Sequence, residues 1–290
     1  MNNKINTPDQ VKAISPYIWN VKTIIILNKV AHFRKGKIRY SDTGSGRAVV
    51  FLHGFLESLE MWNYYVSHLP KNVRSICIDL PGHGKSDNFG YVHSMEMMAE
   101  SVKAVLKQEG LQKVIIVGHS MGGYTALAFA ELYPDMIKGV SLYFSSAAAD
   151  NEEKKANRNR AIKLVEQNKS SFVRNSIPLL FTEAHRIKYA KTITTLIKRA
   201  NTMGVQSIIA ALGGMRDRSD NEIVLKFAPF PFSYIIGDMD PVLPAEMLTK
   251  QSKIPQNCTL VILKKTGHMG FIENKKEAFL AVKDFIQSIY

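Results

Sequence analysis

Apolar runs of strand length alternate with amphipathic segments along most of the chain. The segments between the runs carry apolar side chains at the three- and four-residue spacing of a helix face. Strands that alternate with helices favour the α/β class, a mostly parallel sheet covered by helices on both faces. The predicted strands are Ile24–Phe33, Lys37–Ser41, Ala48–Leu52, Val73–Ile78, Lys113–Val117, Lys138–Phe144, Phe232–Gly237 and Thr259–Lys264. The predicted core helices are Leu59–Leu69, His93–Glu109, Met121–Tyr133 and Lys275–Ile289.

The alternation stops between Asp150 and Asn221, where the apolar residues fall on helical faces instead. We therefore predict an α/β core of residues 21–149 and 222–290, with a helical insertion of residues 150–221. Residues 1–20 form a polar leader without a readable role. The clearest helical face in the insertion consists of Val205, Ile208, Ile209, Leu212 and Met215.

The chain also carries a strong positive charge. The chain has 290 residues, 46% of them hydrophobic, and a net charge of +13. Much of the charge lies in the insertion, where twelve Lys and Arg outnumber four Glu between Glu152 and Ala200. We interpret this as a solvated helical surface; the alternative is attraction of an anionic substrate or an acidic carrier protein. No nucleic-acid-binding module is recognisable, which argues against nucleic acid as a partner.

Three further features bear on location. The longest apolar run near the start, Thr23–Leu27, is far shorter than the roughly 20 residues of a membrane-spanning helix. The leader lacks the basic start, apolar middle and cleavage site of a signal peptide. Cys77 and Cys258 both lie in strand-like runs, and we expect two buried free thiols. These features favour a cytoplasmic protein without a membrane span.

A G-x-S-x-G sequence spans residues 118–122, with Ser120 at its centre. It directly follows an apolar strand and opens a helix, which is the setting of a nucleophile elbow. The tight turn leaves room only for very small side chains two positions away, and these positions are Gly118 and Gly122. The sequence therefore predicts that Ser120 is a nucleophile.

A serine needs a base to remove its proton, and the base needs an acid to hold its tautomer. His268 follows the strand Thr259–Lys264, in the kind of loop where open α/β sheets place their sites. Asp240 follows the strand Phe232–Gly237 and is the predicted acid. Asp238 in the same loop is the alternative, and Asp150 is a third candidate.

Acyl transfer also needs two N–H groups for the oxyanion. The start of the helix after the nucleophile offers Met121, and the loop after Ala48–Leu52 offers Phe55. No metal ion or cofactor is implied. The aromatic and Met side chains next to these motifs could contact an acyl chain, although each is also an ordinary core candidate. They are Phe55, Trp62, Tyr124, Phe144 and Met269.

The chain order Ser120, Asp240, His268 is the nucleophile–acid–base order of one known superfamily. Together with His53-Gly54-Phe55 and the D-x-P-G-H-G-K-S stretch at residues 79–86, it resembles the α/β-hydrolase superfamily from about Ile24 to the C-terminus. The resemblance implies that residues 150–221 are a helical cap that shapes the substrate pocket. It also implies a structural role for the loop at residues 79–86. Residues 212–220 are similar to the final cap helix of small esterases and enol-lactonases.

A serine at position 120 excludes the relatives of this fold that use an aspartate nucleophile. We expect a hydrolase that cleaves a carboxylic ester, thioester or lactone through an acyl-Ser120 intermediate, with a small-molecule substrate. Two alternatives use the same scaffold. One is a carbon–carbon bond hydrolase, and the other is a ligand-binding or receptor protein with slow turnover.

Overall fold

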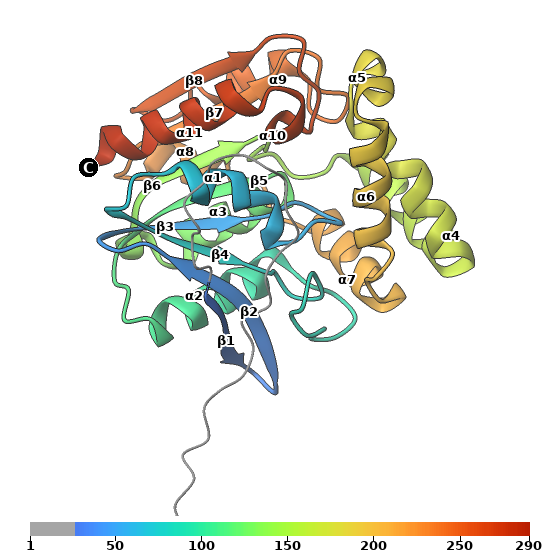
Figure 1. Ribbon diagram of the computed structural model, residues 1–290, viewed down its shortest axis with the longest axis horizontal. Helices are drawn as coiled ribbons and strands as arrows, with labels where there is room; N and C mark the ends of the chain where they lie inside the picture. Colours follow the sequence, from blue (N-terminus) through green and yellow to red (C-terminus); the bar gives the residue numbers. More distant parts are fainter. Residues whose placement is uncertain (1–26) are drawn as a thin grey trace, which may run out of the picture.

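The computed structural model describes residues 27–290, and the predicted leader, residues 1–20, lies outside them. Within this range an eight-stranded sheet has the order β1-β2-β4-β3-β5-β6-β7-β8 (Figure 1). Strand β2 pairs antiparallel with β1 and β4, and the other pairs are parallel, which confirms the predicted α/β class. The strands are β1 Leu27–Phe33, β2 Gly36–Thr43, β3 Arg47–Leu52, β4 Val73–Ile78, β5 Val114–His119, β6 Ile137–Tyr143, β7 Phe232–Gly237 and β8 Cys258–Leu263.

Helices cover both faces of the sheet (Figure 1). On one face α2 packs on α3, where Thr125 Oγ1 lies 3.5 Å from Met98 Sδ. On the other face α1 packs on α11, with the rings of Tyr65 and Phe279 5.7 Å apart. No helix within residues 27–290 is both long and apolar enough to cross a membrane. The helices are α1 Asn63–His68, α2 Met95–Gln108, α3 Met121–Leu132, α4 Glu152–Ser176, α5 Glu183–Lys188, α6 Ala190–Ala200, α7 Val205–Arg216, α8 Glu222–Phe227, α9 Ala245–Gln251, α10 Gly270–Glu273 and α11 Lys275–Ile289. Three short 3₁₀ turns are η1 Leu59–Trp62, η2 Pro134–Met136 and η3 Pro178–Leu180.

The central strands are mostly apolar because helices bury both of their faces. Every residue of β5 and β7 is buried, whereas most residues of β8, at the edge of the sheet, are partly exposed. The two cysteines differ for this reason: Cys77 in β4 is buried, but Cys258 at the start of β8 is only partly buried. The prediction of two buried thiols was therefore wrong for Cys258, although both cysteines are free.

One core helix differs from its prediction. The segment expected as a single helix, Leu59–Leu69, is a 3₁₀ turn, η1, followed by the α-helix α1. The backbone N–H of Leu59 donates to Asp79 Oδ1 at 2.8 Å. Asp79 is fully buried in the loop after β4. Its hydrogen bond therefore ties the start of η1 to that loop.

The helices α4 to α7 lie together beside one end of the sheet and form the cap region (Figure 1). Helix α4 packs along α7, and Ile208 and Leu212 on the predicted apolar face of α7 are buried. Helix α4 is interrupted at Asn168, which has non-helical angles of φ −157° and ψ 87°. The Asn168 side chain accepts a hydrogen bond from the N–H of Ser171 at 2.9 Å and so caps the second half of the helix. Helix α8, in contrast, contacts α3 of the core.

A buried histidine joins the cap to the core. His93 is fully buried, and its backbone N–H donates to the carbonyl of Ala210 in α7 at 2.9 Å. Its Nε2 accepts from the N–H of Phe89 at 3.2 Å. Burial lowers the pKa of His93 to about 4. The imidazole is therefore neutral in the folded protein at neutral pH.

The lowered pKa of His93 predicts a loss of stability in acid. Between about pH 6.5 and pH 4 the unfolded chain binds a proton that the folded protein does not, so stability present above this window is lost as the pH falls. Each unit of pKa shift corresponds to about 1.4 kcal/mol, so His93 should contribute a loss on the order of 3 kcal/mol. Urea unfolding from about pH 7 to about pH 4.5 measures it. The variant His93→Gln, whose amide oxygen can still accept from Phe89, should show a shallower pH dependence; equal slopes for both proteins would contradict the assignment.

Candidate active site

The predicted nucleophile lies in a strained turn between β5 and α3. Ser120 has φ 50° and ψ −114°, a backbone conformation that non-glycine residues rarely adopt. A Cβ atom at Gly118 would lie 2.4 Å from the carbonyl oxygen of Gly122, and one at Gly122 would lie 2.4 Å from that of Leu52. Both positions therefore require glycine because the chain approaches itself closely. The turn leaves the Ser120 side chain partly exposed at the end of the sheet.

Ser120, His268 and Asp240 form a continuous chain of hydrogen bonds. His268 Nε2 lies 2.9 Å from Ser120 Oγ, and His268 Nδ1 lies 2.8 Å from Asp240 Oδ2. The other oxygen of Asp240 accepts from the N–H groups of Val242 and Leu243, at 2.8 and 3.0 Å. The side chain of Asp240 is fully buried, so its carboxylate is held rigidly against the imidazole. In this arrangement the imidazole can accept the proton of the serine hydroxyl.

The structure distinguishes the three candidates for the acid that orients His268. Asp238 Oδ1 accepts from the N–H of Thr266 at 3.3 Å, and Asp238 makes no hydrogen bond or ion pair with His268. Asp150 is buried at the base of the cap, where its two oxygens pair with Arg158 at 3.0 Å and Arg218 at 2.8 Å. Both carboxylates therefore have local structural partners, and Asp240 is the one beside the imidazole.

The loop after β3 lies against the turn that carries Ser120. The carbonyl oxygens of Leu52 and His53 both lie within 2.7 Å of the position a Gly122 Cβ would take. Among the residues that the structure describes, neither the backbone N–H of Phe55 nor that of Met121 donates a hydrogen bond. Two unpaired donors from two different elements thus remain near Ser120. Met121 is also the first residue of α3, where the helix dipole favours negative charge.

Sequence reasoning did not single out His119. Its Nε2 lies 3.1 Å from the carbonyl oxygen of His268, and the two rings are 5.2 Å apart. Burial lowers the pKa of His119 well below its ordinary value, so the ring is neutral and Nε2 can donate to that carbonyl. His119 therefore supports the loop that carries His268. Nothing in the motif pointed to this role, because the position is the variable one before the serine.

Phe55 differs from the other proposed substrate contacts, because it is partly exposed and its ring lies 6.5 Å from that of Phe172 in α4. The remaining four side chains are 4% exposed or less and pack inside the protein. For example, the guanidinium of Arg218 covers the Tyr124 ring at 4.0 Å. Contact between these four side chains and a substrate stays a prediction. They are Trp62, Tyr124, Phe144 and Met269.

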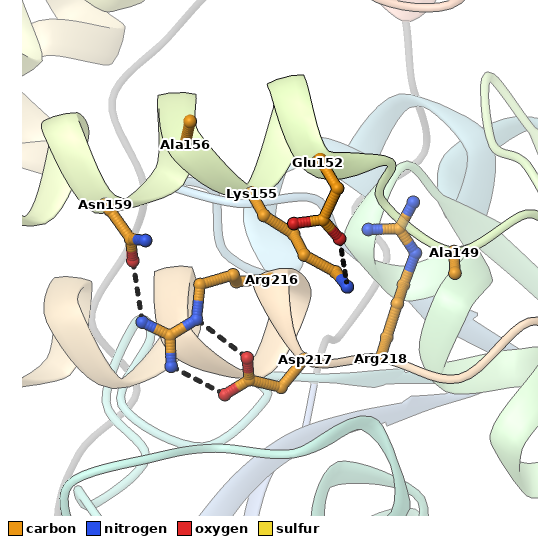
Figure 2. A pocket seen from close by; sticks show the side chains of 8 residues that line it. All are labelled: Ala149, Glu152, Lys155, Ala156, Asn159, Arg216, Asp217 and Arg218. Atoms are coloured by element: carbon orange, nitrogen blue, oxygen red, sulfur yellow. Dashed lines mark hydrogen bonds and ion pairs between the residues drawn. The ribbon is translucent and has the colours of Figure 1, made fainter.

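A solvent-open hollow of about 470 Å³ lies between the start of α4 and the end of α7 (Figure 2). Its walls include two ion pairs, Lys155 with Glu152 at 2.9 Å and Arg216 with Asp217 at 2.7 Å. None of its lining residues belongs to the hydrogen-bonded chain of Ser120 or to the loop of Phe55. We therefore do not assign this charged hollow to an acyl chain. Within residues 27–290, no group of three or more His, Cys, Asp or Glu side chains could hold a metal ion.

Comparisons with known proteins bear on the fold and the family. The chain is 27% identical to a thermophilic esterase from Thermogutta terrifontis, whose structure matches with a TM-score of 0.84 over 91% of this chain and 99% of that one. The enol-lactonase from Burkholderia xenovorans LB400 shares the fold, with a TM-score of 0.82, 18% identity, and coverage of 89% of this chain and all of that one. The chain is also 25% identical to the dihydrolipoyllysine-residue acetyltransferase component of the acetoin cleaving system of Cupriavidus necator. That match covers 83% of this chain but only 64% of the relative.

A family model also matches the chain directly. The model, described as alpha/beta hydrolase fold, matches residues 47–275. The match includes β3 to β8, the cap region and the residues Ser120, Asp240 and His268. The protein therefore belongs to the α/β-hydrolase family.

Proposed function

We propose that the protein is a serine hydrolase that cleaves a carboxylic ester, thioester or lactone by two-step acyl transfer through Ser120. The observation that carries the proposal is the hydrogen-bonded chain from Ser120 Oγ through His268 to Asp240, with distances of 2.9 and 2.8 Å. Its serine lies in a strained turn that presents the hydroxyl at the end of the sheet. A nucleophile, a base and an orienting acid in this order are the minimum for acyl transfer.

The first step forms the acyl-enzyme. Ser120 Oγ attacks the carbonyl carbon of the substrate while His268 Nε2 takes its proton. Asp240 stabilises the imidazolium that results. The negative charge on the carbonyl oxygen is held by the N–H groups of Phe55 and Met121, which have no other acceptor among the described residues. His268 then protonates the departing alcohol, thiol or lactone oxygen, and the acyl group stays on Ser120.

The second step releases the acid. Water takes the place of the leaving group, and His268 removes a proton from it as it attacks the acyl carbonyl. The same two N–H groups hold the second oxyanion. Collapse of this intermediate returns the proton to Ser120 Oγ and frees the carboxylic acid. The proton transfers use Ser120, His268 and Asp240, which already lie within hydrogen-bond distance of one another.

We further propose that the substrate is an anionic small molecule. The cap carries the excess of Lys and Arg between Glu152 and Ala200, so its field favours approach of a negative charge. This attraction is screened by salt, because the Debye length falls from about 10 Å at 0.1 M to about 3 Å at 1 M. For an anionic ester, kcat/KM should therefore fall as salt is added, more steeply than for a neutral ester of the same length.

A profile of activity across p-nitrophenyl esters and acyl thioesters of increasing chain length tests the proposal, with Ser120→Ala as the blank. We expect turnover with at least one chain length, and we expect the blank to lose it. The same assay addresses the two alternatives on this scaffold. A stoichiometric burst without further turnover would favour the ligand-binding protein, and absence of reaction with every ester would leave carbon–carbon bond hydrolysis as the better hypothesis.

A further inference from the structure

The loop that carries His268 is in direct contact with the cap. The backbone N–H of His268 donates to the carbonyl of Leu180, at the end of η3, at 2.9 Å. One residue earlier, a Cβ atom at Gly267 would lie 2.9 Å from the backbone nitrogen of Thr182 and 3.0 Å from the Leu180 carbonyl oxygen. The glycine therefore allows the cap turn at residues 180–182 to lie directly on the backbone of the histidine loop.

A buried carboxylate, that of Glu273 in α10, lies at the same contact. Its Oε1 accepts from the N–H of Thr182 at 2.9 Å and lies 3.0 Å from Nδ1 of His185, both in the cap. Its Oε2 accepts from the N–H of Met269, the residue after His268, at 3.2 Å. The side chain of Glu273 is fully buried. One carboxylate thus joins two groups of the cap to the histidine loop.

These contacts constrain the backbone of His268 on both sides. The N–H of His268 is held by Leu180, and the following N–H, of Met269, is held by Glu273. An ionised carboxylate makes stronger hydrogen bonds than a neutral acceptor, and it is costly to bury without partners. If the cap turn moved away, Glu273 would lose Thr182 and His185 together. The position of the histidine loop is therefore coupled to the seating of the cap.

We propose that Glu273 is a positioning residue that sets the backbone of the catalytic base, His268, and couples it to the cap turn at residues 180–182. This inference rests on the proposed function. Glu273 touches neither Ser120 nor the reacting atoms, so its effect passes through His268. A small displacement of a catalytic group lowers the rate of the chemical step more than it changes substrate binding. Loss of the Glu273 contacts should therefore lower kcat and leave KM nearly unchanged.

Two variants test the coupling from opposite sides. Glu273→Gln replaces one carboxylate oxygen by an amide group that cannot accept a hydrogen bond. Thr182→Pro removes the N–H that donates to Oε1 at 2.9 Å and puts the proline Cδ in its place, so the Glu273 carboxylate has to move away. The backbone angles themselves suit proline, with φ −62° at Thr182 and φ −96°, ψ 154° at the preceding Phe181. Each variant has a matched control. Thr182→Ala keeps the N–H, and Glu277→Gln changes an exposed acid whose contact is Asn274 at 2.7 Å.

The readouts are kcat and KM for a small activated ester, the rate at which a fluorophosphonate labels Ser120, and the unfolding temperature. We expect Glu273→Gln and Thr182→Pro to lower kcat and the labelling rate by about tenfold, with KM within about twofold of wild type. Both controls should behave as wild type. If Glu273→Gln does not fold, Thr182→Pro decides the question alone.

A lower unfolding temperature with unchanged kcat and labelling rate would overturn the inference, because Glu273 would then only stabilise the fold. A change in KM without a change in kcat would overturn it as well. Failure of the proposed function looks different: the wild-type protein would neither hydrolyse an ester nor react with the fluorophosphonate, and the inference would fall with it.

Discussion

Ser120→Ala should lower kcat for ester hydrolysis by at least about 10⁴-fold, because it removes the atom that bonds to the acyl group. The oxyanion donors and the substrate pocket remain, so a small residual rate is expected from binding and charge stabilisation alone. The fold should persist. The serine side chain is partly exposed and its loss removes one hydrogen bond, which changes the unfolding free energy by about 1 kcal/mol or less.

Ser145→Ala is the matched control, because it removes a serine hydroxyl from the same turn. Ser145 Oγ donates to the backbone carbonyl of Ser120 at 2.8 Å, so it belongs to the same turn, but it is not placed against His268. We expect its activity to fall less than about tenfold, as for a supporting hydrogen bond worth about 1 kcal/mol. Equal losses for the two variants, or an active Ser120→Ala protein, would show that damage to the turn rather than loss of the nucleophile explains the effect.

Asp240→Asn should lower kcat by about 10³- to 10⁴-fold with little change in KM. The amide cannot stabilise the imidazolium, and it can present a donor to Nδ1 that favours the wrong tautomer of His268. Asp238→Asn is the matched comparison, because Asp238 lies two residues away and bonds the Thr266 N–H instead of the imidazole. We expect its kcat to stay within about threefold of wild type, since a single hydrogen bond contributes about 1 kcal/mol.

Steady-state kinetics of both Asp variants at one pH decides which of the two aspartates orients His268. A large loss for Asp238→Asn and a small loss for Asp240→Asn would reverse the assignment. A small loss for both would contradict the view that a carboxylate orients His268 at all. Circular dichroism of each protein separates these outcomes from unfolding.

Local features of the sequence were sufficient to predict the strand, turn and helix that position Ser120. Ser120 sits between a strand and a helix that are its immediate neighbours in the chain, and close approach explains the two glycines beside it. The mostly parallel sheet was predictable for a similar reason, since runs such as Phe232–Gly237 are mostly apolar, as is typical of strands that are buried on both faces. Periodicity of this kind is readable without knowing the tertiary structure.

The choice between Asp238 and Asp240 was harder, because both follow the same strand. The choice depends on how the loop after β7 turns: the N–H groups of Val242 and Leu243 bind one oxygen of Asp240 and direct the other toward His268. Sequence spacing does not contain that information. The structure was needed to show which of two carboxylates, two positions apart in the sequence, lies beside His268.

The connection between the cap and the histidine loop could not be predicted at all. Glu273 bonds the N–H of Thr182 across 91 residues of sequence, and the contact also depends on a backbone atom. Neither residue belongs to a motif with the serine. Similarly, the interruption of α4 at Asn168 leaves the periodicity of apolar residues almost unchanged, so only the backbone angles reveal it. Tertiary contacts of this kind require coordinates.

Detection of the acyl-enzyme would show directly that Ser120 is the nucleophile. The wild-type protein is mixed rapidly with excess of an activated p-nitrophenyl ester, quenched in acid within the first turnover, and analysed by mass spectrometry after proteolysis. Acyl transfer through Ser120 predicts a burst of about one equivalent of p-nitrophenol per protein, with the acyl mass on the peptide that contains Ser120. Multiple turnovers without an acylated peptide, or an acyl group on another residue such as Cys77, would contradict it.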